Sequence, residues 1–147
     1  MREIKFKAKR LDNGKWAYGY GVIIADDFCV LDKRDELQIQ RPYTFRNNTH
    51  WFELCGIMCD TNTLSQFTGL HDKNGKEIYE GDIVRFPTLP HKNKYRIGYI
   101  GFHQLSASFR IVTKTSDLRL GNRYGVPEMT IDVIGNIHDN PELLKQK

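Results

Sequence analysis

Hydrophobic and polar residues alternate most regularly near the start of the chain. Residues 4–9 alternate apolar side chains with lysines, and residues 16–24 carry a large apolar side chain at every second position. Successive side chains point to opposite faces of a strand, so each segment predicts a strand with one buried face. Asn13-Gly14 lies between the segments, and both residue types tolerate the positive φ of a tight turn. The pattern predicts a β-hairpin over residues 3–24 whose buried face is formed by Trp16, Tyr18, Tyr20, Val22 and Ile24.

Short apolar segments separated by turn residues fill the second half of the chain. A Gly-Asp-x-Val step at residues 81–84 is typical of a strand that opens an SH3-like barrel, because glycine allows a tight entry and aspartate accepts backbone N–H groups. Asn140 and Pro141 are typical of the cap and first position of a helical turn over residues 140–144. The candidate strands are residues 66–70, 76–78, 83–86, 95–102, 108–113 and 129–134.

The middle segment, residues 25–60, is less regular. Residues 37–40 predict a short strand, and Pro42 with residues 46–49 predicts an exposed connection. Residues 51–58 are apolar enough to be buried, but at this length the pattern does not distinguish strand from helix. The sequence does not predict the strand order here.

The predicted fold class is mostly β, with an N-terminal β-hairpin region, a C-terminal SH3-like small barrel and little helix. Several short strands with turns between them favour a small barrel or sandwich. A polar break at residues 60–63 predicts two domains, residues 1–62 and 63–147. The same break is equally compatible with a loop inside one continuous domain.

Composition places the chain among ordinary globular proteins. It has 147 residues, of which 39% are hydrophobic and 27% are charged, and a chain of this length buries a substantial core. The net charge of +4 permits an anionic partner without requiring one, because Lys and Arg are spread along the chain. Dedicated nucleic-acid binders usually gather their basic residues on one face.

The cellular location follows from the N-terminus and the cysteines. The first residues are charged and no apolar signal-peptide core follows them, and no apolar stretch approaches the length of a membrane span. Three cysteines, Cys29, Cys55 and Cys59, cannot all pair within one chain. We therefore expect a reducing, cytoplasmic location and no membrane partner.

Segments at the start, middle and end of the chain resemble the YopX family. The middle segment is the most specific, and it contains Gln66-Phe67-Thr68-Gly69-Leu70 and Tyr79-Glu80-Gly81-Asp82-Ile83-Val84. The resembling segments are residues 2–9, 14–16, 18–20, 63–84, 133–137 and 140–144.

The resemblance implies a fold and a source more clearly than a function. YopX-like proteins are encoded by phages and prophages of Gram-positive bacteria, which implies the cytoplasm of a bacterial host, and their C-terminal part is similar to an SH3-type barrel. The family supplies no established activity and no catalytic residues. The chain departs from the family pattern at Leu64-Ser65 and His138-Asp139, and residues 25–60 and 87–128 match weakly.

One pair of cysteines has a spacing that suits a metal. Cys55 and Cys59 are separated by three residues, within the range found in structural zinc sites. A zinc site needs four ligands, and only His50 and His71 could be recruited to complete it. Small buried apolar residues are the favoured interpretation of both cysteines.

Two acidic motifs have a catalytic or metal-binding interpretation and a structural one. Asp72, Asn74 and Glu77 are spaced in part like a calcium loop, but a turn with Gly75 in the left-handed conformation explains them. Glu80 and Asp82 could divide acid and base roles, or could cap a turn. The structural interpretation is favoured for both.

Sequence motifs of known catalytic or nucleotide-binding sites are missing from the chain. It has no Gly-x-Ser-x-Gly, no phosphate-binding glycine loop and no dinucleotide fingerprint. The scattered histidines favour surface positions over catalytic ones: His50, His71, His91, His103 and His138. We therefore predict a protein that is not an enzyme and has no cofactor.

Aromatic and basic residues on the same predicted strands form the candidate binding surface. Aromatic side chains stack bases in single-strand binders, where basic side chains contact phosphates. Tyr18, Tyr20 and Phe102 fit this chemistry too, although burial in the core is favoured for the first two. The candidate surface consists of Lys94, Tyr95, Arg96, Tyr99 and Arg110.

The sequence leaves two functions open beyond catalysis. The first is a non-catalytic interaction module that acts through self-association or a protein partner, because exposed strand edges favour such contacts. The alternative is a nucleic-acid-binding accessory protein in phage replication or regulation. Salt-sensitive binding of nucleic acid would distinguish them.

Overall fold

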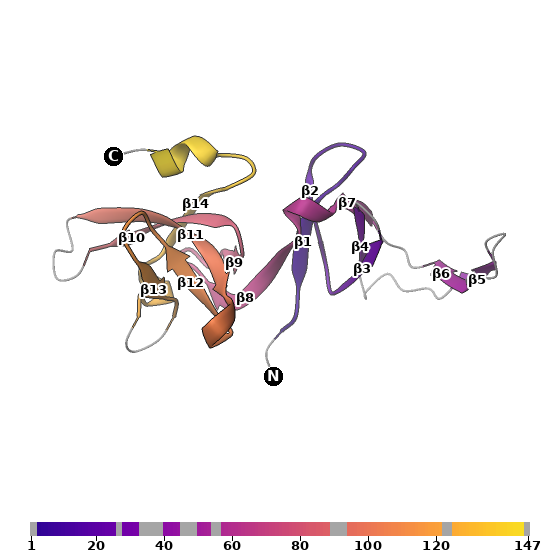
Figure 1. The fold of residues 1–147 in the computed structure, drawn as a ribbon, viewed down its shortest axis with the longest axis horizontal. Coiled ribbons are helices and arrows are strands. Elements are labelled where there is room, and N and C mark those ends of the chain that lie inside the picture. Colours follow the sequence, from indigo (N-terminus) through magenta and orange to yellow (C-terminus); the bar gives the residue numbers. More distant parts are fainter. Residues whose placement is uncertain are drawn as a thin grey trace. The chain divides into compact units, whose positions relative to one another are not determined.

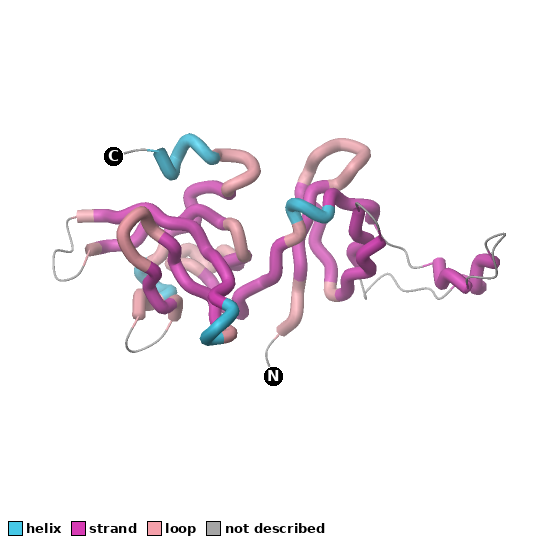
Figure 2. Tube along the Cα trace, in the orientation of Figure 1, coloured by secondary structure: helices cyan, strands magenta, loops and turns pink. Residues whose placement is uncertain are grey.

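The computed structural model describes residues 3–25, 28–32, 40–44, 50–53, 57–88, 94–121 and 125–145. Antiparallel strands dominate these residues, and the helical segments among them are short 3-10 helices (Figure 1, Figure 2). The mostly-β prediction is confirmed. The chain divides into two compact units, residues 4–66 and residues 67–147 together with 1–3. No described helical segment is long and apolar enough to cross a membrane.

Three sets of antiparallel strands form the N-terminal unit. Strand β1 pairs with β2 and with the first two residues of β8, β4 pairs with β3 and β7, and β5 pairs with β6. The elements are β1 (Phe6–Lys9), β2 (Trp16–Gly19), β3 (Gly21–Ala25), β4 (Phe28–Asp32), β5 (Gln40–Thr44), β6 (His50–Glu53), β7 (Ile57–Asp60), η2 (Thr61–Thr63) and β8 (Ser65–His71).

The predicted hairpin is present, but its second strand is shorter than predicted. Gly14 adopts φ +66° between β1 and β2, a conformation that glycine takes without steric cost. The second strand stops at Gly19, and Tyr20 forms a bend. The following strand, β3, then pairs with β4 instead of continuing the hairpin.

The predicted orientation of the second hairpin strand is wrong, because its small residue Ala17 faces the core, whereas Ala8 and Phe6 of the first strand face the core as predicted. Ala8 and Ala17 are buried together with Cys59, whereas Tyr18 is 45% exposed. The aromatic side chains share the other face with the lysines of β1. The Lys7 Nζ lies 4.7 Å from the centroid of the Trp16 ring. Lysine stems and ammonium groups cover aromatic rings favourably, so the ring loses water contact without entering the core.

The middle segment differs from its prediction in two places. Pro42 lies within β5 and not in a connection, at a register shift between Gln40 and Tyr43. Such an irregularity tolerates proline, which cannot donate a hydrogen bond to the ladder. Met58 is exposed, although residues 51–58 were predicted to be buried. Residues 37–39 and 46–49 lie outside the described residues.

The C-terminal unit has the connectivity of an SH3-like barrel. Its five-stranded sheet has the order β13-β12-β11-β10-β14, so a four-stranded meander is followed by a 3-10 helix and a last strand that returns to the first (Figure 1). Strand β9 pairs with β8. The elements are β9 (Glu77–Tyr79), β10 (Asp82–Pro87), β11 (Tyr95–His103), η3 (Gln104–Ser106), β12 (Ser108–Val112), β13 (Asp117–Arg119), η4 (Glu128–Thr130), β14 (Asp132–Asn136) and η5 (Pro141–Lys145).

One cluster of aliphatic and aromatic side chains forms the core of this unit. Alternation along β10, β11 and β12 directs one face of each strand inward and leaves the other outside. The core consists of Ile78, Val84, Phe86, Ile100, Ile111, Leu120 and Ile131.

Strand β14 starts three residues later than the predicted strand at residues 129–134. Met129 and Thr130 belong to η4, where the Thr130 hydroxyl donates a 2.7 Å hydrogen bond to the Pro127 carbonyl. This local bond favours the 3-10 turn over a strand. Met129 is consequently on the surface.

Candidate binding surface of the C-terminal unit

The outer face of the sheet β11-β12-β13 brings together aromatic and basic side chains from the predicted surface. Tyr99 lies opposite Val112, and Gly101 lies opposite Arg110. Because Ile100 and Ile111 occupy the inner face, these four residues share the outer one. Gly101 has no side chain, and the Tyr99 ring extends over it: Tyr99 Cε2 is 3.6 Å from the place of a Cβ at residue 101.

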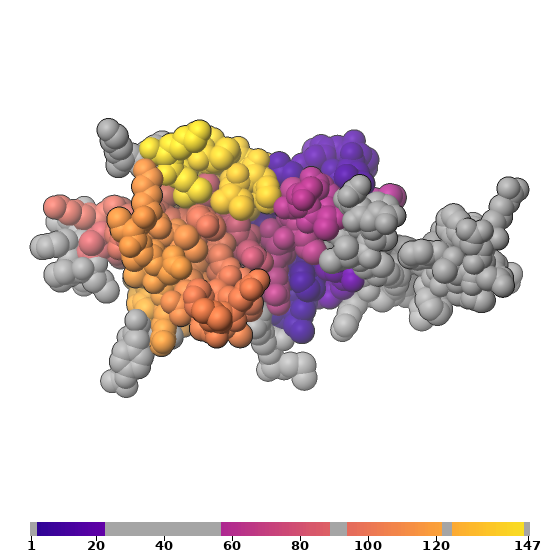
Figure 3. All heavy atoms as spheres, viewed as in Figure 1, coloured from indigo at the N-terminus to yellow at the C-terminus, as the bar shows by residue number. Residues whose placement is uncertain are grey.

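A groove of about 450 Å³ runs along the start of this face, between β11 and the C-terminal 3-10 helix η5. Figure 3 shows the yellow C-terminal residues packed on the strands of this unit. Tyr95 lines the groove and is 62% exposed, while Tyr99 is half-buried. The apolar lining is completed by Ile97, Val112 and Leu144. The groove therefore offers a mainly apolar and aromatic surface.

Arg96 lines the groove, but its guanidinium donates hydrogen bonds to neighbouring hydroxyl groups. Its Nη2 donates to Thr113 Oγ1 at 2.9 Å, to Thr115 Oγ1 at 3.1 Å and to Ser116 Oγ at 3.1 Å. The guanidinium also lies 5.9 Å from the centroid of Phe86. This arginine holds the connection after β12 in place through its Nη2, and its role as a phosphate ligand stays a prediction.

The other predicted residues are distributed along the same strands. Lys94 precedes β11, where its carbonyl accepts a 2.7 Å hydrogen bond from the Thr88 N–H. Tyr95 is covered on one side by Arg85, whose guanidinium is 5.6 Å from the ring centroid. Arg110 lies at the opposite end of the face. Leu144 was not among the predicted residues, because nothing in the sequence pattern predicts that η5 packs next to β11.

A polar cluster surrounds the turn between β11 and β12. Ser106 Oγ lies 2.8 Å from His103 Nδ1 and 2.8 Å from Ser108 Oγ, and it accepts a 3.1 Å hydrogen bond from Arg110 Nη2. His103 Nδ1 also accepts from the Ser106 N–H at 3.3 Å, so Ser106 donates its only hydroxyl proton to that nitrogen. Its oxygen lone pairs are engaged by Arg110 and Ser108. The cluster therefore stabilises the turn, and Ser106 is not arranged as a nucleophile.

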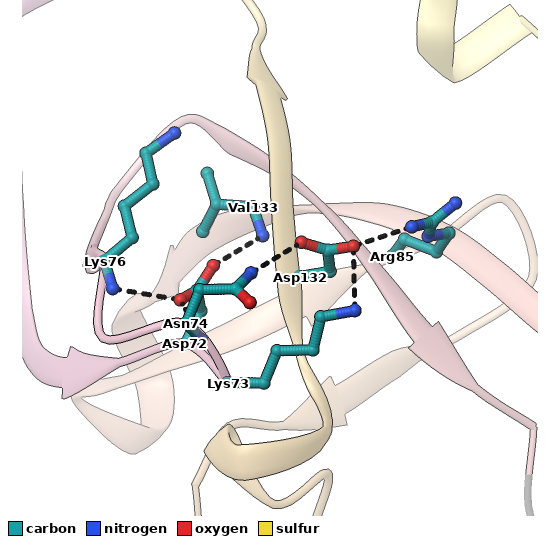
Figure 4. A network of polar contacts seen from close by, with 7 residues as sticks. All are labelled: Asp72, Lys73, Asn74, Lys76, Arg85, Asp132 and Val133. Carbon is teal, nitrogen blue, oxygen red and sulfur yellow. Dashed lines mark hydrogen bonds and ion pairs between the residues drawn. The ribbon is translucent and has the colours of Figure 1, made fainter.

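The acidic turn at residues 72–76 has the structural role that was favoured (Figure 4). Asp72 Oδ1 accepts the N–H groups of Asn74 and Lys76 at 2.8 and 2.9 Å, and Oδ2 accepts the Val133 N–H at 3.1 Å. Burial by itself raises the pKa of Asp72, but the three N–H donors outweigh it and lower the pKa below its ordinary value. Gly75 is in the left-handed conformation, as predicted.

A second carboxylate joins this turn to the sheet. Asp132 accepts a 2.7 Å hydrogen bond from Arg85 and forms an ion pair with Lys73 at 3.0 Å. The hydrogen bonds from Arg85 and Lys73 lower the pKa of Asp132. Asn74 Nδ2 donates to Asp132 at 3.2 Å, so β10, β14 and the turn are linked through one side chain (Figure 4).

Asp82 caps a turn, which confirms the structural interpretation of the Glu80 and Asp82 pair for this residue. It is buried, and its oxygens accept the Tyr79 N–H at 2.9 Å and Asn136 Nδ2 at 3.0 Å. Cys59 is buried in the apolar cluster of the N-terminal unit, as favoured, while Cys55 lies outside the described residues. Within the described ranges, no three His, Cys, Asp or Glu side chains are grouped to hold a metal ion.

Comparisons with known proteins agree with this architecture. The family model described as "YopX protein" matches residues 5–145. The crystal structure of protein EF1440 from Enterococcus faecalis is similar over 96% of this chain and 97% of that chain, with 27% sequence identity and a TM-score of 0.56. No curated protein matches the chain.

Proposed function

The chain belongs to the YopX family, and we propose that it is a non-catalytic interaction module whose groove between β11 and η5 binds a second copy of the chain. We place this activity in the cytoplasm of a bacterial host, in line with the cysteine content. The observation that carries the proposal is the groove, which combines two tyrosines with three aliphatic side chains.

The lining of the groove suits a protein partner better than a charged ligand. The centres of protein interfaces are enriched in aromatic residues and depleted of charge. The charged residues that line this groove are Arg96 and Lys114, and hydroxyl groups already bind the guanidinium of Arg96. Tyr95 has the exposure and size of an interface anchor.

The same unit also exposes apolar side chains of the kind that such a groove accepts. Leu105 is 95% exposed and Met129 is 79% exposed. A groove on one patch and a projecting apolar residue on another allow a head-to-tail contact between copies. Contacts of this type build rings when the rotation closes. A second copy is therefore the occupant that the chain itself can supply.

The polar clusters of this unit support a non-catalytic role. Asp72 and Asp82 bind backbone N–H groups, and Ser106 exchanges hydrogen bonds within its own turn. A nucleophile needs a base and space for substrate. Each of these side chains instead forms hydrogen bonds within the fold, so a role in stabilising the structure explains why it is there.

Replacing Tyr95 and Leu144 together with alanine is expected to weaken self-association about thirtyfold, since loss of one interface anchor costs about 2 kcal/mol or more. Sedimentation velocity over a concentration series measures the change. The control is Tyr18→Ala, which removes a tyrosine that is 45% exposed in the other unit. A wild-type protein that stays monomeric at ~100 µM, or a groove variant that associates like wild type, would contradict the proposal.

A further inference from the structure

A second pocket, of about 300 Å³, lies beside β12 and the end of β13. Its lining comprises Ser106, Ser108, Phe109, Arg110, Arg119 and Leu120. We infer that this pocket binds a backbone phosphate of a single-stranded nucleic acid. The inference goes beyond the proposed self-association, because it concerns a different pocket and a different partner.

Two arginines face each other in this pocket. Arg110 and Arg119 are direct cross-strand partners in the antiparallel pair β12-β13. Like charges in this position destabilise a sheet unless an anion compensates them. No acidic residue lines the pocket, and neither guanidinium forms an ion pair with a carboxylate of the described residues. Asp117, the nearest acid on β13, lies two register pairs away, opposite Val112.

The donors around the pocket suit a phosphate group. Arg110 is oriented by its hydrogen bond to Ser106, and its buried Nε lacks a hydrogen-bond partner. Arg119 is an exposed residue on the neighbouring strand. Two planar guanidinium groups together offer more N–H donors than the two oxygens of a carboxylate can accept, so they suit an oxyanion with three or four oxygens better. Ser108 adds a hydroxyl at the rim.

The neighbouring surface favours a nucleic-acid strand as the source of the phosphate. The Tyr99 ring extends over Gly101, and Gly101 is the cross-strand partner of Arg110. An aromatic ring beside a guanidinium on an open sheet face is the arrangement in which a base stacks while its phosphate is neutralised. A phosphorylated side chain of a protein would use the arginines but would not need the ring.

Fluorescence anisotropy of a labelled single-stranded DNA dodecamer tests the inference at ~50 and ~200 mM salt. The variant is Arg110→Gln with Arg119→Gln. Its matched control is Lys15→Gln with Lys145→Gln, which removes the same charge from two exposed positions. We expect the arginine variant to bind at least about tenfold more weakly than the control, with a salt dependence reduced by about one to two phosphate contacts.

Two control measurements separate a loss of nucleic-acid binding from a loss of folding or of self-association. Circular dichroism checks that the variants are folded, and sedimentation velocity should show that the arginine variant self-associates like wild type. Equal affinities of the arginine variant and the lysine control would overturn the inference, as would no binding at ~50 mM salt. Protection of the arginines by inorganic phosphate or a phosphoserine peptide, without DNA binding, would reassign the pocket to another phosphate source and also overturn it.

Discussion

Replacing Asp72 with asparagine is expected to lower the free energy of unfolding of the C-terminal unit by about 2–4 kcal/mol, because hydrogen bonds to a charged acceptor are strong and an unpaired buried donor is costly. Asp72 is 6% exposed and accepts three backbone N–H groups. Asparagine keeps one acceptor oxygen, but its amide nitrogen faces an N–H donor. Urea unfolding followed by circular dichroism measures the loss, and hydrogen exchange assigns it to this unit.

The matched control for this variant is Asp117→Asn on the surface of β13. Asp117 is exposed, so the same chemical change there should shift stability by about 0.5 kcal/mol at most. Equal effects of the two substitutions would show that the network in Figure 4 does not stabilise the unit.

Asp72 and Asp132 also predict how stability depends on pH. Both have a pKa below the ordinary value in the folded protein, so the unfolded chain binds more protons as the pH falls. Their contribution is present above the unfolded pKa of about 3.9 and is lost as the pH falls through the folded values. Wild type should therefore lose stability from about pH 5 downward, and Asp72→Asn should lose less over that range. Parallel curves for the two proteins would contradict this explanation.

Ile111→Ala is expected to destabilise the C-terminal unit by about 2–5 kcal/mol, since it leaves a cavity in a packed core. Ile111 is fully buried, on the strand whose outer face carries Arg110 and Val112. Loss of this side chain should also loosen the sheet that positions both pockets. Urea unfolding measures the effect, and Ile111→Val should cost only about 0.5–1.5 kcal/mol.

Val112→Ala serves as the control on the opposite face of the same strand. Val112 is half-buried and lines the groove, so its truncation should affect self-association more than stability. If Val112→Ala destabilises the unit as much as Ile111→Ala, the assignment of inner and outer faces is wrong.

Local pattern was sufficient to predict most of the C-terminal unit. Strands β10, β11 and β12 are segments rich in β-branched and aromatic residues and bounded by turn residues, and the turn at Asp72 and Gly75 carries its own conformational preferences. In the second strand of the N-terminal hairpin the same reasoning selected the wrong face. Lysines on β1 cover the rings of β2, and a pattern along one strand does not show what the neighbouring strand supplies.

The candidate surface was predictable only in part, because it depends on contacts between distant segments. Tyr95 and Tyr99 are separated by an even number of positions on one strand, so the sequence predicts that their side chains share a face. The engagement of Arg96 by three hydroxyl groups depends on how the chain turns after β12. The return of Leu144 to β11, and the pairing of Arg110 with Arg119, likewise require the folded topology.

Side-chain oxidation by hydroxyl radicals, measured at dilute and at high protein concentration, tests the central claim most directly. If a second copy binds in the groove, Tyr95 and Leu144 should be oxidised more slowly at high concentration, while Tyr18 in the other unit should react at the same rate. Unchanged oxidation of Tyr95 and Leu144 at a concentration where the protein is oligomeric would show that the groove is not the interface.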